Sequence, residues 1–275
     1  MSTQQNAKTV LITGSSTGIG RETALFFQKK GWNVAASMRT PAKEKLLNTL
    51  ENTIIPKLDV TDAKSIKEAI ATTISKFGKI DAIVNNAGYG LTGPFEGAST
   101  EQITKQYDTN VFGIMNVIRE ILPHFRSNKS GVIVNVASMG GRIVFPYYSL
   151  YHGTKWAVEG FTESLRFELE PLGIRVKIVE PGAIKTDFYE RSNESSIDSS
   201  PSDYKLLCER AFKKYKSTEA GATQPDKVAK AIYKATTDGS KKLRYTIGPD
   251  AKSLLFLRNF LPDGAYAAMV RMAIF

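Results

Sequence analysis

Two residues of types that transfer protons lie one helical turn apart near the middle of the chain. Tyr151 and Lys155 are separated by four positions, so on a helix they share one face. A lysine ammonium beside a tyrosine favours the phenolate and lowers a phenol pKa that is about 10 in model peptides. Tyr151 is therefore a candidate general acid and base. Ser138, which ends the apolar run GVIVNVAS, is a candidate hydroxyl for holding a substrate oxygen.

Short apolar runs rich in β-branched residues alternate with segments of helical period along most of the chain. Residues 63–77, for example, place Ile66, Ile70, Ile74 and Phe77 on one face. This alternation predicts an α/β fold in which a doubly wound parallel sheet carries helices on both faces. Ligands bind such sheets beyond the carboxyl ends of the strands. The predicted strands are residues 9–13, 33–37, 53–58, 80–85, 131–137, 175–180 and 243–247.

The first predicted strand ends in a glycine-rich turn, TGSSTGIG, at residues 13–20. Gly14 allows a tight turn, and we expect Gly18 and Gly20 to let the backbone approach a pyrophosphate. The following helix would offer its first N–H groups and its positive dipole end to phosphate. An ordinary glycine-rich loop is the alternative. The candidate cofactor contacts are Gly14, Ser16, Thr17, Gly18, Ile19 and Gly20.

Polar residues also follow the next strands. Arg39 stands where an NAD site usually has an acid, which indicates NADP(H), with Ser37 as a helper, unless Arg39 is simply exposed. Asp59-Val60 is a candidate adenine contact, and the alternative is that Asp59 caps the next helix. Asn86-Ala87-Gly88 lets a cofactor lie close, and the Asn86 amide either locks the turn or bonds the ribose.

A long helical stretch, residues 100–125, contains Asn110, a polar residue in a region whose apolar members include Ile103, Tyr107, Ile114, Val117 and Ile121. A buried asparagine needs hydrogen-bond partners. Asn110 either braces the Tyr151–Lys155 pair or caps neighbouring backbone.

Together, TGSSTGIG, NNAG, Asn110, Ser138 and YHGTK resemble the short-chain dehydrogenase/reductase family over roughly residues 8–188. Twelve residues separate Ser138 from Tyr151, as the family usually has. The resemblance implies a Rossmann fold with a central, mostly seven-stranded parallel sheet. It also implies that Pro181, Gly182, Ile184 and Thr186 form the turn that meets the nicotinamide amide.

The same resemblance implies the roles of a catalytic tetrad. Tyr151 would exchange a proton with the substrate oxygen, and Lys155 would lower the pKa of Tyr151 and bond the nicotinamide ribose. Ser138 would stabilise the developing alkoxide, while Asn110 would hold a water in the proton relay. The implied reaction interconverts a carbonyl and an alcohol with NADP(H), NAD(H) being the second choice. A nucleotide-sensing protein of the same fold without turnover is the alternative.

The NNAGYGLTGPFE stretch and the C-terminal extension look closest to the branch of 17β-hydroxysteroid and retinol dehydrogenases, which suggests a lipophilic substrate. The candidate substrate contacts are Tyr89, Leu91, Met139, Phe145, Tyr148 and Phe188. Residues 188–223 are expected to form a lid or a surface insertion, and the polar stretch 192–202 a mobile loop. The apolar segment 250–275 could cover the pocket, meet another subunit or rest on a membrane surface.

Composition and charge narrow the class of protein. The 275 residues suit one domain, residues 1–275. One cysteine, Cys208, excludes an intrachain disulfide, and with only His124 and His152 beside it a metal site is not expected. No signal peptide or membrane span is recognised, so we expect a cytoplasmic protein. The net charge of +10 is spread out, which indicates a solvated surface rather than nucleic-acid binding. The family resemblance implies a homodimer or homotetramer through the helix 151–170 and the helix that carries Asn110. In the first of these helices, Ala157, Phe161 and Leu165 form either core or interface.

Overall fold

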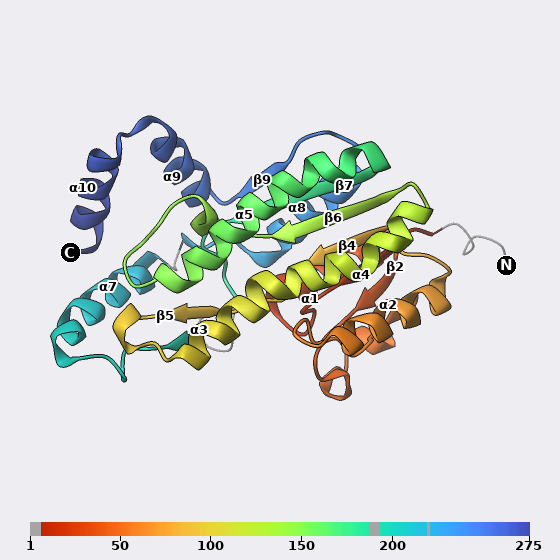
Figure 1. The fold of residues 1–275 in the computed structure, drawn as a ribbon, viewed down its shortest axis with the longest axis horizontal. Helices are drawn as coiled ribbons and strands as arrows, with labels where there is room; N and C mark the ends of the chain where they lie inside the picture. Colours follow the sequence, from red (N-terminus) through yellow and green to blue (C-terminus); the bar gives the residue numbers. More distant parts are fainter. Residues whose placement is uncertain (1–6, 187–192, 219–220) are drawn as a thin grey trace.

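A seven-stranded parallel sheet forms the centre of the computed structural model, which describes residues 7–186, 193–218 and 221–275 (Figure 1). The strand order is β3-β2-β1-β4-β6-β7-β9, so the chain winds outward from β1 first to one side and then to the other. This confirms the predicted doubly wound Rossmann fold, and all seven predicted strands are present. Their bounds are β1 Thr9–Ile12, β2 Asn33–Ala36, β3 Thr53–Ile54, β4 Ala82–Asn85, β6 Gly131–Val136, β7 Ile174–Pro181 and β9 Arg244–Ile247.

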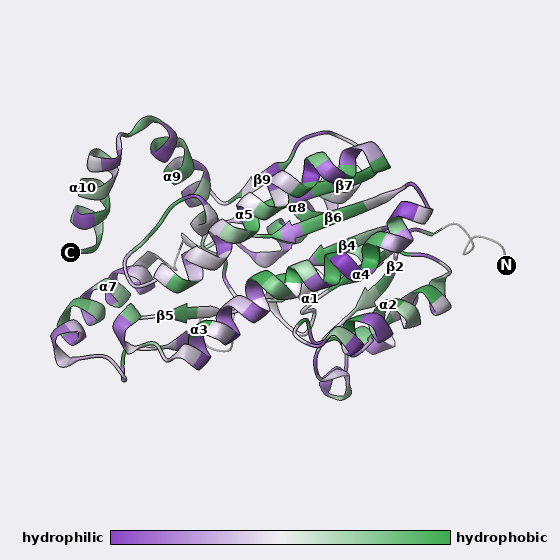
Figure 2. Cartoon of the chain, in the orientation of Figure 1, coloured by the Kyte–Doolittle hydropathy of each residue, from purple (hydrophilic) through white to green (hydrophobic). Residues whose placement is uncertain are grey.

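Helices cover both faces of the sheet because the central strands are apolar on both sides. Leu11 packs toward α2 (Ala63–Phe77), α4 (Gly113–Ser127) and α5 (Ser149–Leu169). Its neighbours Val10 and Ile12 pack toward α1 (Gly18–Lys29) and α8 (Pro225–Thr237) on the other face. Figure 2 shows hydrophobic residues concentrated along β4 and β6, between these two layers. Leu165 of α5 is buried in the core and Phe161 packs partly buried against it, which supports the core role predicted for this face.

The predicted helical stretch over residues 100–125 is present and contains one irregular turn. α3 (Thr100–Tyr107) is followed by a π-helical turn, Asp108–Phe112, which leads directly into α4. A π turn widens the backbone ring and re-aims the side chains that follow, a device common at functional sites.

A second, two-stranded parallel sheet lies beside the main one. β5 (Gly90–Thr92) pairs with β8 (Asn193–Ser195). Of the stretch 192–202, predicted as a mobile loop, residues 193–195 form this strand, and two serine side chains farther along bond backbone carbonyls. Ser196 is buried, and its hydroxyl donates to the Pro94 carbonyl at 2.7 Å.

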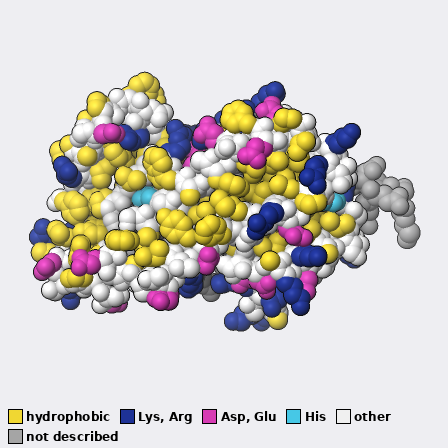
Figure 3. Space-filling model, viewed as in Figure 1, with side chains coloured by type: hydrophobic (Ala, Val, Ile, Leu, Met, Phe, Trp, Pro, Cys, Tyr) yellow, Lys and Arg dark blue, Asp and Glu magenta, His cyan; other side chains and the backbone are white. Residues whose placement is uncertain are grey.

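The C-terminal helices α9 (Pro249–Phe260) and α10 (Asp263–Ile274) cover the loop that follows Ser138 (Figure 1). Ile143 of that loop is buried with Leu255 and Tyr266, and the Tyr266 hydroxyl donates to the Val144 carbonyl at 3.2 Å. The outer sides of α9 and α10 remain exposed at Phe256, Phe260, Met272 and Phe275. Figure 3 shows hydrophobic side chains reaching the surface over much of this face of the molecule.

α7 (Lys205–Thr218) lies beside α10, and short 3-10 turns occur at Pro41–Lys43, Leu47–Thr49, Phe95–Gly97, Met139–Gly141, Glu170–Leu172 and Ser202–Tyr204. None of the helices in the described part of the chain has both the length and the apolarity to span a bilayer.

Candidate active site

The ends of β1 and β4 are joined by hydrogen bonds that shape the glycine-rich turn. The Thr13 hydroxyl oxygen accepts from the backbone N–H groups of Asn86 and Ala87, both at 3.0 Å. The Asn86 amide nitrogen donates to the carbonyls of Thr13 (3.0 Å) and Gly14 (3.1 Å). Asn86 thus locks the turn, one of its two predicted roles. Thr13 was not predicted as a site residue, although a hydroxyl at a strand end was the available signal.

The three glycines of this turn have different reasons to be glycine. Gly14 has φ +69°, and a Cβ there would lie 2.9 Å from the Ala87 Cα. A Cβ on Gly20 would overlap the Gly14 carbonyl oxygen and lie 2.5 Å from the Asn86 amide nitrogen. The missing Cβ of Gly20 therefore lets α1 pack closely on the Gly14 peptide and the Asn86 side chain. Gly18, with φ +53°, has its open side toward Thr186, whose methyl would lie 3.4 Å from an added Cβ.

The start of α1 suits an anion. Thr17 occupies the N-cap position without a side-chain hydrogen bond to the helix, and the first turn carries no acidic residue. The first N–H groups of a helix need partners, and an uncapped positive dipole end attracts phosphate. Ser16 is exposed, while Thr17, Gly18 and Ile19 are half-buried. These residues fit the diphosphate of a dinucleotide.

The segment after β7 faces this turn from the other side and is firmly held. The Gly182 N–H donates to the Ile247 carbonyl (2.8 Å), and the Ala183 N–H donates to the Asp250 carboxylate (2.7 Å). Ile184 forms an isolated bridge with Thr223. The turn Pro181–Thr186 and the glycine-rich turn thus lie close together, because Thr186 meets Gly18.

The residues after β2 and in the loop before α2 differ in their accessibility. Arg39 is exposed, and no hydrogen bond or ion pair joins it to any described residue, so its guanidinium is available to an anion. Ser37 is fully buried, and its hydroxyl donates to the Ile12 carbonyl at 2.9 Å, which removes it from the open surface.

Asp62, not Asp59, caps α2. Asp59 instead accepts from the backbone and hydroxyl of Thr61 (3.0 and 2.8 Å). Val60 is buried against Gly113.

Tyr151 and Lys155 lie on α5, where it passes the end of β6. The Lys155 ammonium donates to the Val136 carbonyl at 3.0 Å and lies 5.7 Å from the centre of the Tyr151 ring. Burial lowers the pKa of Lys155 to about 8, opposed by the charge of Glu159. Ser138 follows β6 directly, and its hydroxyl oxygen accepts the Gly140 N–H at 3.0 Å. The structure therefore brings the three predicted side chains to one strand end.

Asn110 makes both kinds of contact that the sequence left open. Its amide oxygen accepts the Tyr89 N–H at 3.0 Å, and its amide nitrogen donates to the Tyr89 carbonyl at 2.8 Å. The same nitrogen donates to the Thr154 hydroxyl at 3.2 Å, next to Lys155. Asn110 thus braces both the segment after β4 and α5.

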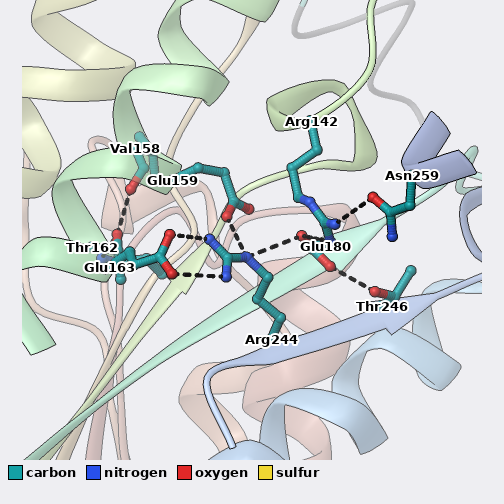
Figure 4. Close-up of polar contacts among 10 residues, drawn as sticks. Arg142, Val158, Glu159, Thr162, Glu163, Glu180, Arg244, Thr246 and Asn259 are labelled. Atoms are coloured by element: carbon teal, nitrogen blue, oxygen red, sulfur yellow. Dashed lines mark hydrogen bonds and ion pairs between the residues drawn. The ribbon is translucent and has the colours of Figure 1, made fainter. Parts of the chain in front are cut away.

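A buried ion network lies one turn beyond Lys155 on α5 (Figure 4). Arg244 of β9 bonds Glu159 (2.9 Å) and Glu163 (2.8 Å) and lies 3.6 Å from Glu180 of β7. Arg142 pairs with the same carboxylate oxygen of Glu180, Oε1, at 3.2 Å. Burial and the charge of Glu180 raise the pKa of Glu159 to about 7, against the pull of Arg244. Sequence reasoning missed this network, although Lys155, Glu159 and Glu163 at steps of four were visible.

The candidate substrate contacts separate into two groups. The Tyr148 ring lies 6.4 Å from that of Tyr151, and α7 adds Phe212 and Tyr215 at 6.1 and 5.4 Å from Tyr148. Phe212 and Tyr215 were not predicted as contacts. The other candidates are less open. Met139 and Phe145 pack on the cluster around Ile143, Leu91 is enclosed in β5, and the Tyr89 hydroxyl is buried without a partner among the described residues. Phe188 lies outside the described residues.

Comparison with known proteins identifies the family. The model of the short chain dehydrogenase family matches residues 8–196, so the chain belongs to the short-chain dehydrogenases/reductases. An uncharacterised oxidoreductase of Schizosaccharomyces pombe is 40% identical over 85% of this chain and 98% of its own length. The 3-ketodihydrosphingosine reductase of Bacteroides thetaiotaomicron is 33% identical over 96% of this chain and 98% of its own.

Solved structures share the whole fold. A short-chain dehydrogenase of Streptomyces avermitilis superimposes with a TM-score of 0.84 at 32% identity, covering 98% of this chain and 97% of its own. ElxO, solved with NADP bound, has a TM-score of 0.74 at 33% identity over 90% and 99% of the two chains. A 3-ketoacyl-(acyl-carrier-protein) reductase of Brucella melitensis, complexed with NADH, has a TM-score of 0.75 at 27% identity over 88% and 96% of the two chains.

Among the described residues, no group of three His, Cys, Asp or Glu side chains is placed to hold a metal ion.

Proposed function

We propose that the protein interconverts a carbonyl and a primary or secondary alcohol, with NADP(H) as the hydride carrier and a lipophilic substrate. The observation that carries this proposal is the meeting of Tyr151, Lys155 and Ser138 at the end of β6. It is joined by the uncapped start of α1 at the end of β1, which β4 separates from β6 in the sheet.

The nicotinamide would supply or accept the hydride, and residues of this chain would hold the dinucleotide. We assign the diphosphate to the turn from Gly14 to Gly18 and the start of α1, which lacks a cap. The 2′-phosphate belongs to Arg39, whose guanidinium has no partner within the described part of the chain. Asp59 and Val60 would meet the adenine, Ala87 and Gly88 the ribose, and residues 181–186 the nicotinamide amide. Arg39 favours NADP(H) over NAD(H), the carrier of the Brucella reductase.

Proton transfer falls to the residues at the end of β6 and on α5. Tyr151 would give its proton to the carbonyl oxygen, since the ammonium of Lys155 nearby favours the phenolate that remains. Ser138 uses its oxygen to accept from Gly140, so its own hydrogen is left to donate to the substrate oxygen. The amide of Asn110 is committed to Tyr89 and Thr154, so a relay water would be held by the Asn110 backbone carbonyl within the π turn.

Aromatic side chains support a lipophilic substrate. Tyr148 stands beside Tyr151, Phe212 and Tyr215 stand beside Tyr148, and the three rings offer apolar faces. The similarity to a 3-ketodihydrosphingosine reductase, named for a long-chain ketone, points the same way. We propose that α7, which carries Phe212 and Tyr215, closes the pocket as part of the lid predicted at residues 188–223.

We further propose that residues 1–275 form one cytoplasmic domain that assembles as a homodimer or homotetramer. The outward face of α5 exposes Trp156 and Phe167, which supports contact between subunits there. The exposed side of α9 and α10 is the part of the chain that would touch a membrane surface.

The test is oxidation of NADPH and NADH by the purified protein with steroid, retinoid, aromatic and long-chain aliphatic ketones and aldehydes. Tyr151→Phe removes only the hydroxyl, so we expect turnover to fall by at least about a thousandfold while NADPH binding stays within about twofold. Full activity in this variant would contradict the mechanism. Tight NADPH binding by the wild type without turnover of any substrate would favour the nucleotide-sensing alternative.

A further inference from the structure

The side chain that follows Tyr151 ties together both ends of the loop that carries Ser138. His152 lies on α5 and is only 4% exposed. Its Nδ1 is 2.8 Å from the Gly140 carbonyl oxygen, near the start of the loop. Its Nε2 is 3.1 Å from the backbone nitrogen of Phe145, at the other end. One imidazole therefore spans the loop.

These two partners fix the proton on the ring. A carbonyl oxygen can only accept, so Nδ1 must carry the hydrogen, and a backbone N–H can only donate, so Nε2 must be unprotonated. The imidazole is thus neutral, in its Nδ1–H form. Burial lowers the pKa of His152 to about 4, although the bond to Gly140 opposes this. The nearest titratable rings, Tyr148 and Tyr151, lie with their centres 5.7 and 5.9 Å away.

Gly140 connects the imidazole to the serine. Its N–H donates to the Ser138 hydroxyl oxygen at 3.0 Å, and its carbonyl accepts from His152. A Cβ on Gly140 would lie 2.5 Å from His152 Nδ1, so only glycine lets the ring approach this closely. One residue, Gly140, therefore links the position of the Ser138 hydroxyl to the helix that carries Tyr151.

We propose that His152 is a positioning residue that sets the Ser138 hydroxyl relative to the Tyr151 phenol through the Gly140 peptide. The inference rests on the proposed function, because the role of Ser138 in turnover belongs to it. Misplacing a group that stabilises the transition state by about 1 Å costs about a hundredfold in rate, and losing such a donor costs a similar factor.

Two conservative variants separate the two bonds of the imidazole. The amide of an asparagine occupies nearly the place of Nδ1, so His152→Asn retains a donor for the Gly140 carbonyl. The amide of a glutamine reaches the place of Nε2, so His152→Gln retains an acceptor for the Phe145 N–H. His152→Leu fills the space and makes neither bond. If Gly140 transmits the effect, only the first variant preserves the position of Ser138.

The kinetic test compares these variants in reductive turnover. We expect His152→Asn to keep kcat within about threefold of the wild type, and His152→Gln and His152→Leu to lose about ten- to a hundredfold, with NADPH affinity unchanged. In a Ser138→Ala background, His152→Gln should cost little further activity, because both changes act through the same hydroxyl. A wild-type kcat in the leucine variant, an asparagine variant as slow as the leucine one, or full additivity with Ser138→Ala would overturn the proposal.

A spectroscopic test needs no turnover. The chain has two histidines, so long-range ¹H–¹⁵N correlations of the wild type and of His124→Gln assign the ring of His152. We expect the neutral Nδ1–H form, with protonation only near pH 4. An Nε2–H form, or protonation near pH 6.5, would refute the assignment of His152 alone. A wild-type protein that turns over no substrate would refute the proposed function, so the two failures are distinguishable.

Discussion

Replacing Gly20 by alanine should lower the free energy of unfolding of the protein without directly touching a ligand. The added Cβ would overlap the Gly14 carbonyl oxygen and lie 2.5 Å from the Asn86 amide nitrogen. The oxygen belongs to backbone, so it cannot swing aside. Either α1 moves away from the β1 turn, or Asn86 gives up its bonds to Thr13 and Gly14.

The size of the effect follows from these contacts. Overpacking of a buried site costs about 1–3 kcal/mol. Two lost hydrogen bonds add about 1 kcal/mol each, and the better helix propensity of alanine returns about 1 kcal/mol. The free energy of unfolding should therefore fall by roughly 2–4 kcal/mol. For a chain of this size that corresponds to a drop in Tm of roughly 5–15 °C.

The assay is thermal unfolding followed by circular dichroism, together with NADPH titration. Gly264→Ala on α10 is the matched control, since nothing lies within 4 Å of a Cβ there, and its Tm should stay unchanged or rise by up to about 4 °C, because alanine is the better helix former. Gly18→Ala should lower NADPH affinity more than stability. Its Cβ meets only the Thr186 side chain, with the methyl at 3.4 Å, and points to the side we assign to the cofactor. The free energy of unfolding should fall by only about 1 kcal/mol, the strain of an alanine at a positive φ. A Gly20→Ala protein as stable as Gly18→Ala would refute the close packing of α1 at Gly20.

Two further substitutions probe charge. Glu159→Gln removes the negative charge that raises the pKa of Lys155, so Lys155 should lose its proton below pH 8 and the alkaline limb of the kcat profile should move to lower pH, by up to about one unit. A limb that stays in place or moves upward would show that Glu159 does not act on Lys155. Arg39→Glu should shift the ratio of kcat/KM from NADPH toward NADH by at least about tenfold, because a carboxylate repels a 2′-phosphate and suits a 2′-hydroxyl. An unchanged ratio would remove Arg39 from the phosphate site.

The features that could be predicted from the chain are those with a local period or a local geometry. Strands such as Asn33–Ala36 and helices such as Ala63–Phe77 follow from runs of apolar residues at steps of two, three or four. The pairing of Tyr151 with Lys155 follows from the pitch of one helix. The doubly wound sheet follows from the alternation of these elements, and with it the end of the sheet at which Thr13, Asn86 and Ser138 meet.

Other features depend on which elements pack together, and only the tertiary structure decided them. Ser37 and Arg39 are two residues apart, yet one is buried against Ile12 and the other is exposed. Gly20 faces Asn86, 66 positions away in the chain. The three-residue strand Asn193–Ser195 has no pattern of its own and is ordered by β5.

Charge and protonation also needed the folded molecule. Glu159 and Glu163 read as a solvated helix face until Arg244 of β9 and the buried Glu180 are seen beside them. His152 reads as an ordinary helix residue until Gly140 and Phe145 are seen to fix its proton. The sequence by itself thus determined the fold and the family and predicted the reacting groups, because these follow from local spacing. Burial and partner identity are properties of contacts between distant segments, so the tertiary structure alone decided which polar groups are buried, paired and held in place.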